Sequence, residues 1–377
     1  MKHCKLILVL ILTVPLSCTN IKNQCFIDGD LKNIKGRVYV YLKDLQEDKF
    51  VDSILVINGK FKFKLEIDHP KDFLIHNKRN QFEFRDSKTI WLEPGKVNIS
   101  GDFNFLKNLK ITGSASNSIY ETYQKMLDSL NHKITAARQS IFLEKNIQSK
   151  EIIQKKYDSL KALLPKKAFM NLLSNSNSYV TLSILYKECY FAFRNLGKNE
   201  IRQVYYKLPD SLKNTSLGVD ILKYINLPEI PKVGEQAYEI AQSNPENKLI
   251  KLSDFKGKYV LVEFWSSNCG PCRVYNREIR KIYDKFKDSN FEILGVSGDI
   301  KKEDWLGAIT MDSITWPSIS DLKGWHNEAF LVYDITNKGI PYNILIDPKG
   351  IIIREDLCNP LALEKELKTI FEEKNGL

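Results

Sequence analysis

The sequence predicts an α/β domain at its C-terminal end, preceded by a small antiparallel β domain and a helical segment. Three observations lead to this arrangement. Apolar strands and amphipathic helices alternate after residue 227. Short strands separated by turn residues dominate up to residue 114. Between them, apolar residues recur every three or four positions in a stretch almost free of glycine and proline.

The composition is that of a globular protein. The chain has 377 residues, of which 43% are hydrophobic and 27% charged, close to the averages for soluble proteins. These values exclude a collagen-like, mucin-like or wholly disordered chain, and the length favours two or three domains.

Residues 1–17 have the layout of a secretory signal peptide. Lys2 and Lys5 precede Leu6–Val14, a run of nine residues with a single hydroxyl group. A helix of that length is too short to cross about 30 Å of hydrocarbon. A basic start before a short apolar core is typical of a signal for export.

The end of this segment resembles a bacterial lipobox. Pro15-Leu16-Ser17-Cys18 places an aliphatic and a small residue before a cysteine, although Pro15 stands where that family usually has leucine. The resemblance implies that Cys18 is acylated and anchors the protein in the bacterial cell envelope, facing the periplasm. Conventional secretion and an uncleaved anchor remain the alternatives.

Residues 18–114 form the predicted β domain. Asn58-Gly59 lies between two alternating apolar runs in 53–67, and this dipeptide favours a type I′ hairpin turn. Further short strands are expected at 37–42, 82–84, 90–92 and 97–99. The pattern is that of a small antiparallel sandwich or barrel.

Residues 115–226 form the predicted helical segment of four or five helices. Its clearest apolar stripe comprises Ile119, Tyr123, Met126, Leu130, Ile134, Ala137 and Ile141. Similar stripes occur in 152–164 and 179–193. A linker follows at 226–231, where Pro228 and Pro231 cannot donate backbone hydrogen bonds.

Residues 227–377 form the predicted α/β domain. A helix with apolar Tyr275, Ile279, Ile282 and Phe286 follows the first long strand. The expected strands are 259–265, 291–296, 342–346 and 351–354, and the expected final helix is 361–371.

The chemistry is carried by Cys269-Gly-Pro-Cys272, directly after the strand 259–265. Cys269 is expected just before the first helical turn, where free N–H groups and the helix dipole stabilise a thiolate. This predicts Cys269 as the nucleophile. Cys272, deeper in the helix, would resolve the mixed disulfide.

The alternatives for this pair are half of a zinc site and an inert disulfide. Zinc needs two further ligands, and the histidines beyond residue 17 (His69, His76, His132 and His326) show no ligand spacing. We therefore expect no metal and no cofactor. Cys25, Cys189 and Cys358 are interpreted as small buried apolar residues.

Residues from about 232 to 375 resemble the thioredoxin-like thiol-disulfide oxidoreductases of bacterial envelopes, the TlpA/ResA type. The matching stretches are Val233–Ala237, Leu252–Gly257, the Trp265–Arg273 core and Ile344–Gly350. The resemblance implies a thioredoxin fold with the dithiol at the end of a central strand. Residues 24–114 resemble a small domain of unknown function that often precedes such domains.

The same resemblance implies a cis-proline at Pro341, in Gly339-Ile340-Pro341. A cis X-Pro bond is a costly turn, and here it would leave the Ile340 backbone free to pair with a substrate peptide. Tyr342 follows where the family usually has threonine. An ordinary trans proline remains the alternative.

Glu263 stands where thioredoxins carry a buried acid, two residues before Trp265. A carboxyl group in that apolar strand should have a raised pKa and could relay a proton for Cys272. The alternative is a solvent-facing or edge glutamate. Trp265 either shields the disulfide or is simply a core residue.

We therefore expect a thiol-disulfide oxidoreductase that reduces disulfides of exported proteins and receives electrons from an envelope thiol donor. One alternative is a thiol peroxidase, because Ser266-Ser-Asn-Cys269 has Ser/Thr-x-x-Cys spacing and Trp316–Asp321 resembles peroxiredoxins. Another is a surface binding module in 18–226 with an accessory redox domain.

The net charge of +10 does not predict nucleic-acid binding. Residues 227–377 hold 20 Lys+Arg against 24 Asp+Glu, so the basic excess lies in the part without a catalytic motif. With no nucleic-acid motif we expect no such partner. A lysine-rich solvated surface, an anionic membrane or an acidic partner would each account for the excess.

Overall fold

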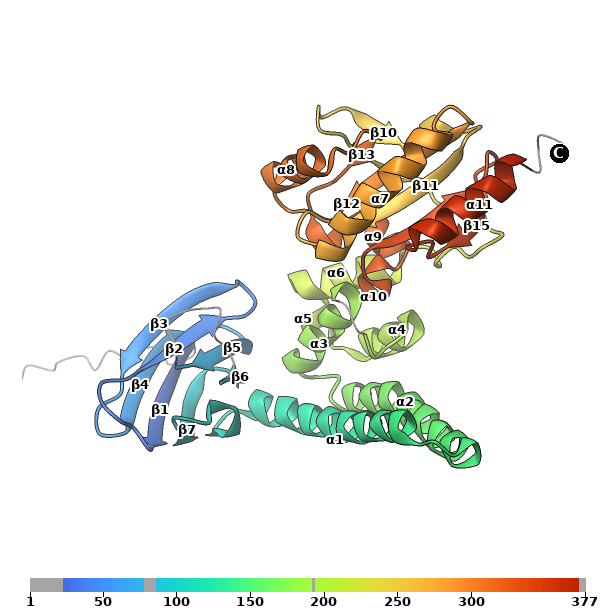
Figure 1. The fold of residues 1–377 in the computed structure, drawn as a ribbon. Coiled ribbons are helices and arrows are strands. Elements are labelled where there is room, and N and C mark those ends of the chain that lie inside the picture. The colour runs from blue at the N-terminus through green and yellow to red at the C-terminus, as the bar shows by residue number, and fades with distance from the viewer. Residues whose placement is uncertain (1–22, 78–85, 192–193, 373–377) are drawn as a thin grey trace, which may run out of the picture. The chain divides into compact units, whose positions relative to one another are not determined.

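The computed structural model describes residues 23–77, 86–191 and 194–372 (Figure 1). The chain divides into two compact units. The first comprises residues 1–160 with 178–180, and the second comprises 161–177 with 181–377. The cysteine pair therefore belongs to the second unit, together with part of the helical segment.

A β sandwich forms the start of the first unit. Its strands are β1 (Gln24–Lys32), β2 (Tyr39–Asp44), β3 (Lys49–Leu55), β4 (Lys60–Glu66), β5 (Lys71–His76), β6 (Ser87–Leu92), β7 (Gly95–Asp102) and β8 (Lys110–Thr112). One sheet has the order β4-β1-β7-β8 and the other β3-β2-β5-β6. Apolar side chains from both sheets share one core, which confirms a β-rich domain. The expected strand at 82–84 lies outside the described residues.

Two expectations for this domain are wrong in detail. Asn58 and Gly59 both have positive φ, 50° and 79°, as a type I′ turn requires. Ile57 and Lys60 close this turn with two backbone hydrogen bonds of 2.9 Å. The expected hairpin does not continue beyond this pair, because β3 pairs with β2 and β4 pairs with β1. In addition, β1 and β7 are parallel. The turn chemistry fixes the local backbone, whereas burial of alternate β4 side chains decides its partner.

The helices of 115–226 follow the apolar stripes, and the described residues contain six instead of four or five. They are α1 (Ala115–Leu143), α2 (Ile147–Ser174), α3 (Tyr179–Tyr190), α4 (Lys198–Lys207), α5 (Asp210–Lys213) and α6 (Ser216–Ile225). The Ser114 side chain caps α1 by accepting the N–H of Asn117 at 3.0 Å. The additional helix is α5, a single turn.

A five-stranded sheet is the centre of the second unit. Its strands are β11 (Tyr259–Trp265), β12 (Phe291–Ser297), β13 (Ser318–Ile319), β14 (Tyr342–Ile346) and β15 (Ile352–Glu355). The order is β13-β12-β11-β14-β15, with β14 and β15 antiparallel to their neighbours. Every residue of the central strand β11 is buried. A two-stranded sheet, β9 (Ala241–Ser243) and β10 (Leu249–Lys251), precedes it.

Helices cover both faces of this sheet. They are α7 (Gly270–Phe286), α8 (Lys302–Asp312), α9 (Glu328–Val332), α10 (Ile335–Lys338) and α11 (Pro360–Glu372). On one face, Leu261 and Trp265 share a core with residues of α7 and α11. On the other, Phe264 packs with Phe330 and Tyr333. This is the thioredoxin-like α/β domain that the sequence predicts.

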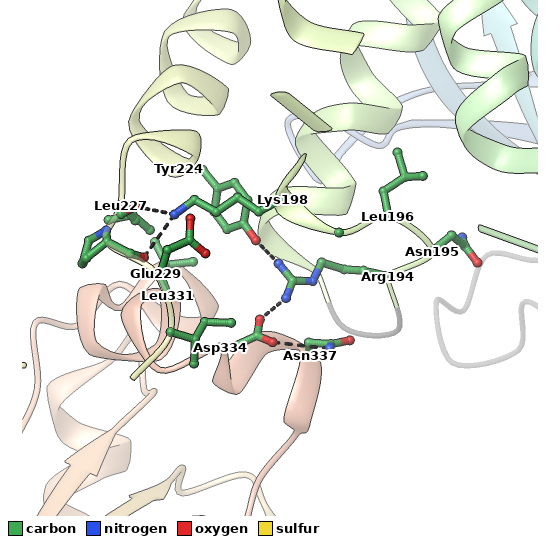
Figure 2. Close-up of a pocket in the computed structure, with 13 residues that line it drawn as sticks. Arg194, Asn195, Leu196, Lys198, Tyr224, Leu227, Glu229, Leu331, Asp334 and Asn337 are labelled. Atoms are coloured by element: carbon green, nitrogen blue, oxygen red, sulfur yellow. Dashed lines mark hydrogen bonds and ion pairs between the residues drawn. The ribbon is translucent and has the colours of Figure 1, made fainter. Parts of the chain in front are cut away.

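Part of the helical segment packs against the domain within the second unit, which the sequence did not predict (Figure 2). Arg194 forms an ion pair with Asp334, just before α10, and donates to the Tyr224 hydroxyl of α6. The His326 ring stacks on Tyr190 of α3, with 4.7 Å between centroids. Tyr190 of α3 thus contacts the segment before β14 directly, and Arg194 links Tyr224 of α6 to it.

Candidate functional site

The sequence around Cys269 places it at the N-terminus of α7. The strand β11 ends at Trp265 and α7 begins at Gly270, with Cys269 as its N-cap residue. The Cys269 Sγ accepts the backbone N–H of Cys272 at 3.1 Å. Pro271 lies in the first turn, where its missing N–H has no cost. A thiolate at Cys269 therefore receives a hydrogen bond and the favourable end of the helix dipole.

The two sulfur atoms differ in access. Cys269 and Cys272 form a disulfide whose Cα atoms lie 5.2 Å apart. Cys269 is half-buried, whereas Cys272 is 0% exposed and belongs to the apolar core under α7. An external thiol or disulfide can thus reach Cys269 but not Cys272.

The Ile340–Pro341 peptide bond is cis, as the resemblance to the thioredoxin-like oxidoreductases implies. It immediately precedes β14, which pairs with β11 beside the dithiol. Both Ile340 and Cys269 are half-buried and pack against the same core as Cys272. The cis-proline segment and the reactive sulfur therefore border one apolar cluster.

Tyr342 does not face this cluster. Its side chain belongs to the core on the other face of the sheet, with Phe264. Its hydroxyl donates to Glu355 at 2.8 Å, and the Lys338 Nζ lies 4.5 Å from the ring centroid. The tyrosine in place of the family's threonine thus serves packing on the opposite face.

Glu263 is fully buried, which excludes the solvent-facing alternative. Its side chain lies on the same face of β11 as those of Leu261 and Trp265, the face that α7 covers. In the sheet, Glu263 pairs with Gly295 of β12 and with Asn343 of β14. Within the described residues, neither carboxyl oxygen has a hydrogen-bond partner. Burial raises the pKa of Glu263 well above its ordinary value, so the neutral carboxylic acid is favoured.

Trp265 is a core residue. It is 0% exposed and packs in the cluster that contains Cys272. Its ring is therefore part of the buried surroundings of Cys272.

Asn343 and Tyr275 form a polar link in the apolar layer under α7, which the sequence did not predict. The Asn343 Nδ2 donates to the Tyr275 hydroxyl at 2.8 Å, and that hydroxyl donates to the Leu357 carbonyl at 2.9 Å. The Cys358 thiol donates to the Pro341 carbonyl at 3.3 Å. The only sequence signal is a polar residue in the apolar strand Tyr342–Ile346.

The other cysteines that the structure describes are not part of the disulfide. Cys25 and Cys189 are buried and Cys358 is half-buried, and all three are free thiols. Cys18 lies outside the described residues. In the described ranges, no three residues of metal-binding type lie together, and none of the helices combines the length and apolar character needed to cross a bilayer.

The fold and this site define a thioredoxin-fold protein with a Cys-x-x-Cys dithiol. Residues 233–355 match the AhpC/TSA family, and residues 26–120 match a domain of unknown function, DUF4369. Through its C-terminal domain the chain belongs to the AhpC/TSA family, as a thiol-disulfide oxidoreductase.

Similar proteins include the thiol-disulfide oxidoreductase ResA of Bacillus cereus. It is 28% identical over 132 residues, which cover 35% of this chain and 73% of ResA. A putative peroxiredoxin of Porphyra purpurea is 34% identical, covering 34% of this chain and 67% of that protein. Among solved structures, a similar one is the thioredoxin domain of a thiol-disulfide oxidoreductase from Bacteroides vulgatus, which is 35% identical to this chain. The match covers 37% of this chain and 98% of that domain, with a TM-score of 0.35.

Proposed function

We propose that this protein reduces disulfides of exported proteins through the Cys269–Cys272 dithiol. The observation that carries the proposal is the contrast between a half-buried cysteine at a helix N-terminus and a fully buried cysteine behind it. The Gly-Pro pair between the cysteines resembles reducing thioredoxins more than strong oxidants, which supports the reducing direction.

The reaction proceeds in two thiol–disulfide exchanges. The Cys269 thiolate attacks one sulfur of a substrate disulfide, the substrate S–S bond breaks, and the other substrate sulfur leaves as a thiolate. Cys272 then loses its proton and attacks the Cys269 sulfur of the mixed disulfide. The second substrate thiolate leaves, so the substrate gains two electrons and the enzyme keeps a disulfide. An envelope thiol donor reduces that disulfide again.

Glu263 is the proposed acceptor of the Cys272 proton. Both groups lie on the α7 side of β11 in an apolar layer, where a thiol cannot give its proton to bulk water. In molecules where Glu263 is ionised, its carboxylate can accept this proton, and the raised pKa favours the protonated form until the disulfide is reduced and the proton returns. Trp265 keeps this layer dry.

Ile340 and Pro341 are the proposed substrate contacts. Ile340 packs against the same cluster as Cys269 and Cys272, so this segment lies beside the dithiol. An extended substrate segment could pair with the Ile340 backbone in the manner of an added β-strand. Such recognition reads the main chain and tolerates varied substrate side chains.

The midpoint potential of the Cys269–Cys272 couple tests the reducing direction. For a reductant we expect a midpoint potential of about −270 mV. A potential of about −120 mV is typical of a strong oxidant and would contradict this proposal. Equilibration of the full chain with glutathione or dithiothreitol buffers gives the measurement.

We place the protein in the bacterial cell envelope, attached by an acyl chain at Cys18. The basic and apolar start of the sequence and the lipobox-like residues before Cys18 support this location. Growth with a radiolabelled fatty acid tests it. Label should enter the protein and be absent from Cys18→Ser, and equal labelling of both forms would reject acylation at Cys18.

A thiol peroxidase is the second candidate, favoured by the match to a putative peroxiredoxin. In this structure the Ser266 hydroxyl donates to Asp299 at 3.1 Å, and Cys272 lies in position to capture any oxidised Cys269. Rapid peroxide consumption that survives Cys272→Ala would favour the peroxidase over the reductase. A binding role of residues 18–226 predicts instead that a Cys269→Ala/Cys272→Ala protein retains full function in cells.

A further inference from the structure

The loop between β11 and α7 carries Ser266, Ser267 and Asn268 immediately before Cys269. Its backbone determines where the Cys269 sulfur lies relative to the first turn of α7. The Cys269 N–H donates to the Ser266 carbonyl at 3.0 Å, so the loop and the cysteine form one tight turn. Whatever holds Ser266 and Ser267 in place therefore also holds Cys269.

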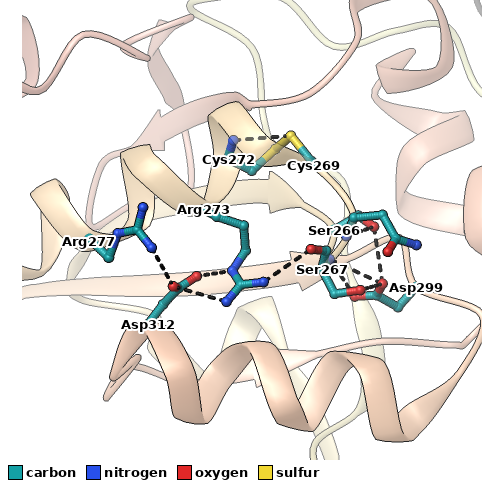
Figure 3. Close-up of polar contacts among 9 residues, drawn as sticks. Ser266, Ser267, Cys269, Cys272, Arg273, Arg277, Asp299 and Asp312 are labelled. Atoms are coloured by element: carbon teal, nitrogen blue, oxygen red, sulfur yellow. Dashed lines mark hydrogen bonds and ion pairs between the residues drawn. A yellow bond between two sulfur atoms is a disulfide. The ribbon is translucent and has the colours of Figure 1, made fainter.

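Asp299 binds this loop from the end of β12 (Figure 3). Its carboxylate is buried, 3% exposed, and accepts the Ser267 N–H at 3.0 Å and the Ser267 hydroxyl at 2.6 Å. It also accepts the hydroxyl of Ser266 at 3.1 Å and that of Ser297 at 2.7 Å. One carboxylate thus holds both the backbone and the side chains of the loop by charge-assisted hydrogen bonds.

Arg273 binds the same loop from the other side. Its Nη1 donates to the Ser267 carbonyl at 3.2 Å, while the guanidinium pairs with the fully buried Asp312 of α8 (Figure 3). Asp312 also pairs with Arg277 at 3.2 Å. Ser267 therefore has its N–H bound by an anion and its carbonyl bound by a cation.

We propose that Asp299 is a positioning residue for the dithiol reaction, which fixes the Ser266–Ser267 loop so that the Cys269 sulfur stays at the N-terminus of α7. Asp299 touches neither sulfur in the disulfide. It acts by maintaining the turn in which the Cys272 N–H points at the Cys269 sulfur. Arg273 also fixes this loop, by donating a hydrogen bond to the Ser267 carbonyl.

A purely electrostatic role would have the opposite consequence. A negative charge near Cys269 disfavours its thiolate, so removing only that charge should lower the thiol pKa and speed alkylation. Loss of positioning instead weakens the hydrogen bond and the helix-dipole contact, which raises the thiol pKa and slows alkylation. The sign of the change separates the two roles.

The test is the pH dependence of iodoacetamide alkylation of Cys269 in the reduced full chain, followed by mass spectrometry of the Cys269 peptide. For Asp299→Asn and Asp299→Ala we expect alkylation at pH 7 to be about three- to tenfold slower, equivalent to a rise of up to about one pKa unit. Ser267→Ala keeps the charge but loses the shortest contact, and we expect a smaller change of the same sign. This milder variant keeps the test decisive where Asp299→Ala does not fold.

The matched control is Asp347→Asn. The Asp347 carboxylate accepts the N–H groups of Lys349 and Ile351, both at 2.9 Å, in the turn between β14 and β15. It has the same kind of bonds in the same domain but no contact with the loop before α7. We expect a loss of stability with unchanged alkylation of Cys269.

Faster or unchanged alkylation in Asp299→Asn overturns the proposal, and so does an equal slowing in Asp347→Asn. The proposal rests on Cys269 as the attacking thiol. Because alkylation reports on Cys269 directly, a failure of the Asp299 prediction is distinguishable from a failure of the proposed function, which shows in substrate trapping.

Discussion

Arg194, in the segment before α4, forms a buried ion pair with Asp334, which precedes α10 and the cis-proline segment. The two side chains are 7% and 12% exposed. The pair ties the helices α3–α6 to the part of the α/β domain that ends at Pro341. These contacts lie within the second unit, between residues of 181–226 and the segment that leads to the cis-proline.

This pair makes a prediction about stability. Asp334→Ala leaves a buried guanidinium without its counter-ion, which should lower the free energy of unfolding by about 3–5 kcal/mol. Denaturant unfolding of the full chain checks this. The matched control is the exposed pair Lys223–Asp220, where Asp220→Ala should cost less than about 1 kcal/mol. Equal losses in both variants would contradict a structural role for Arg194 and Asp334.

Glu263 predicts a pH dependence of stability. Burial raises the pKa of this carboxyl group in the folded state, so the folded protein keeps a proton that the unfolded chain releases. This pKa difference stabilises the folded state fully below about pH 4.3, the pKa of a glutamate in the unfolded chain. The stabilisation is lost as pH rises towards the pKa of Glu263 in the folded state, at about 1.4 kcal/mol per pH unit.

Glu263→Gln removes this titration. Relative to the native protein, the variant should become progressively more stable as pH rises above about 4.3 towards the folded-state pKa of Glu263, as measured by denaturant unfolding at several pH values. It should also resolve mixed disulfides more slowly, because Cys272 loses its proton acceptor. A stability difference that does not change with pH would show that Glu263 is not the buried acid described here.

We expect alkylation of the folded protein to select Cys269 over the three free thiols Cys25, Cys189 and Cys358. Burial raises the pKa of Cys25 to about 11 and that of Cys358 to about 12, and raises the pKa of Cys189 well above its ordinary value. In the folded, reduced protein at pH 7.5, a short pulse of iodoacetamide should modify Cys269 before these three. After unfolding in urea all should react. Early labelling of Cys358 in the folded state would contradict this ranking.

We expect substitution of Tyr342 to lower the stability of the domain without changing the reactivity of Cys269. Tyr342→Thr removes a large buried side chain on the face opposite α7, so it should destabilise the domain by about 3–5 kcal/mol. The rate of Cys269 alkylation in the protein that remains folded should not change. Tyr342→Phe, which loses only the hydroxyl bond to Glu355, should cost about 1 kcal/mol. An altered Cys269 rate in Tyr342→Phe would place this residue in the site after all.

The sequence predicts those features that local patterns determine. The strands around Trp265 and Ile344, the position of Cys269 before a helix and the conformation of Asn58-Gly59 all follow from neighbouring residues. The pairing of β3 and β4 does not, because a turn fixes the local backbone while burial across the whole sandwich decides which sheet a strand joins.

The same limit applies to the site. Glu263 could be identified because the resemblance to thioredoxins implies a buried acid at this position, and the strand around it is apolar. Asp299 and Ser267 are 32 residues apart, and Arg194 and Asp334 are 140 apart. Such contacts exist only once the sheet has formed, and polar residues at the ends of elements look alike in sequence whether or not they have a buried partner.

The most direct test of the central claim is trapping of substrates by single-cysteine variants of the full chain. With Cys269 as the nucleophile and Cys272 as the resolving thiol, Cys272→Ala should accumulate mixed disulfides with exported proteins, and Cys269→Ala should accumulate almost none. Equal trapping by the two variants, or trapping by Cys269→Ala alone, would contradict the assignment of the two sulfurs on which the mechanism depends.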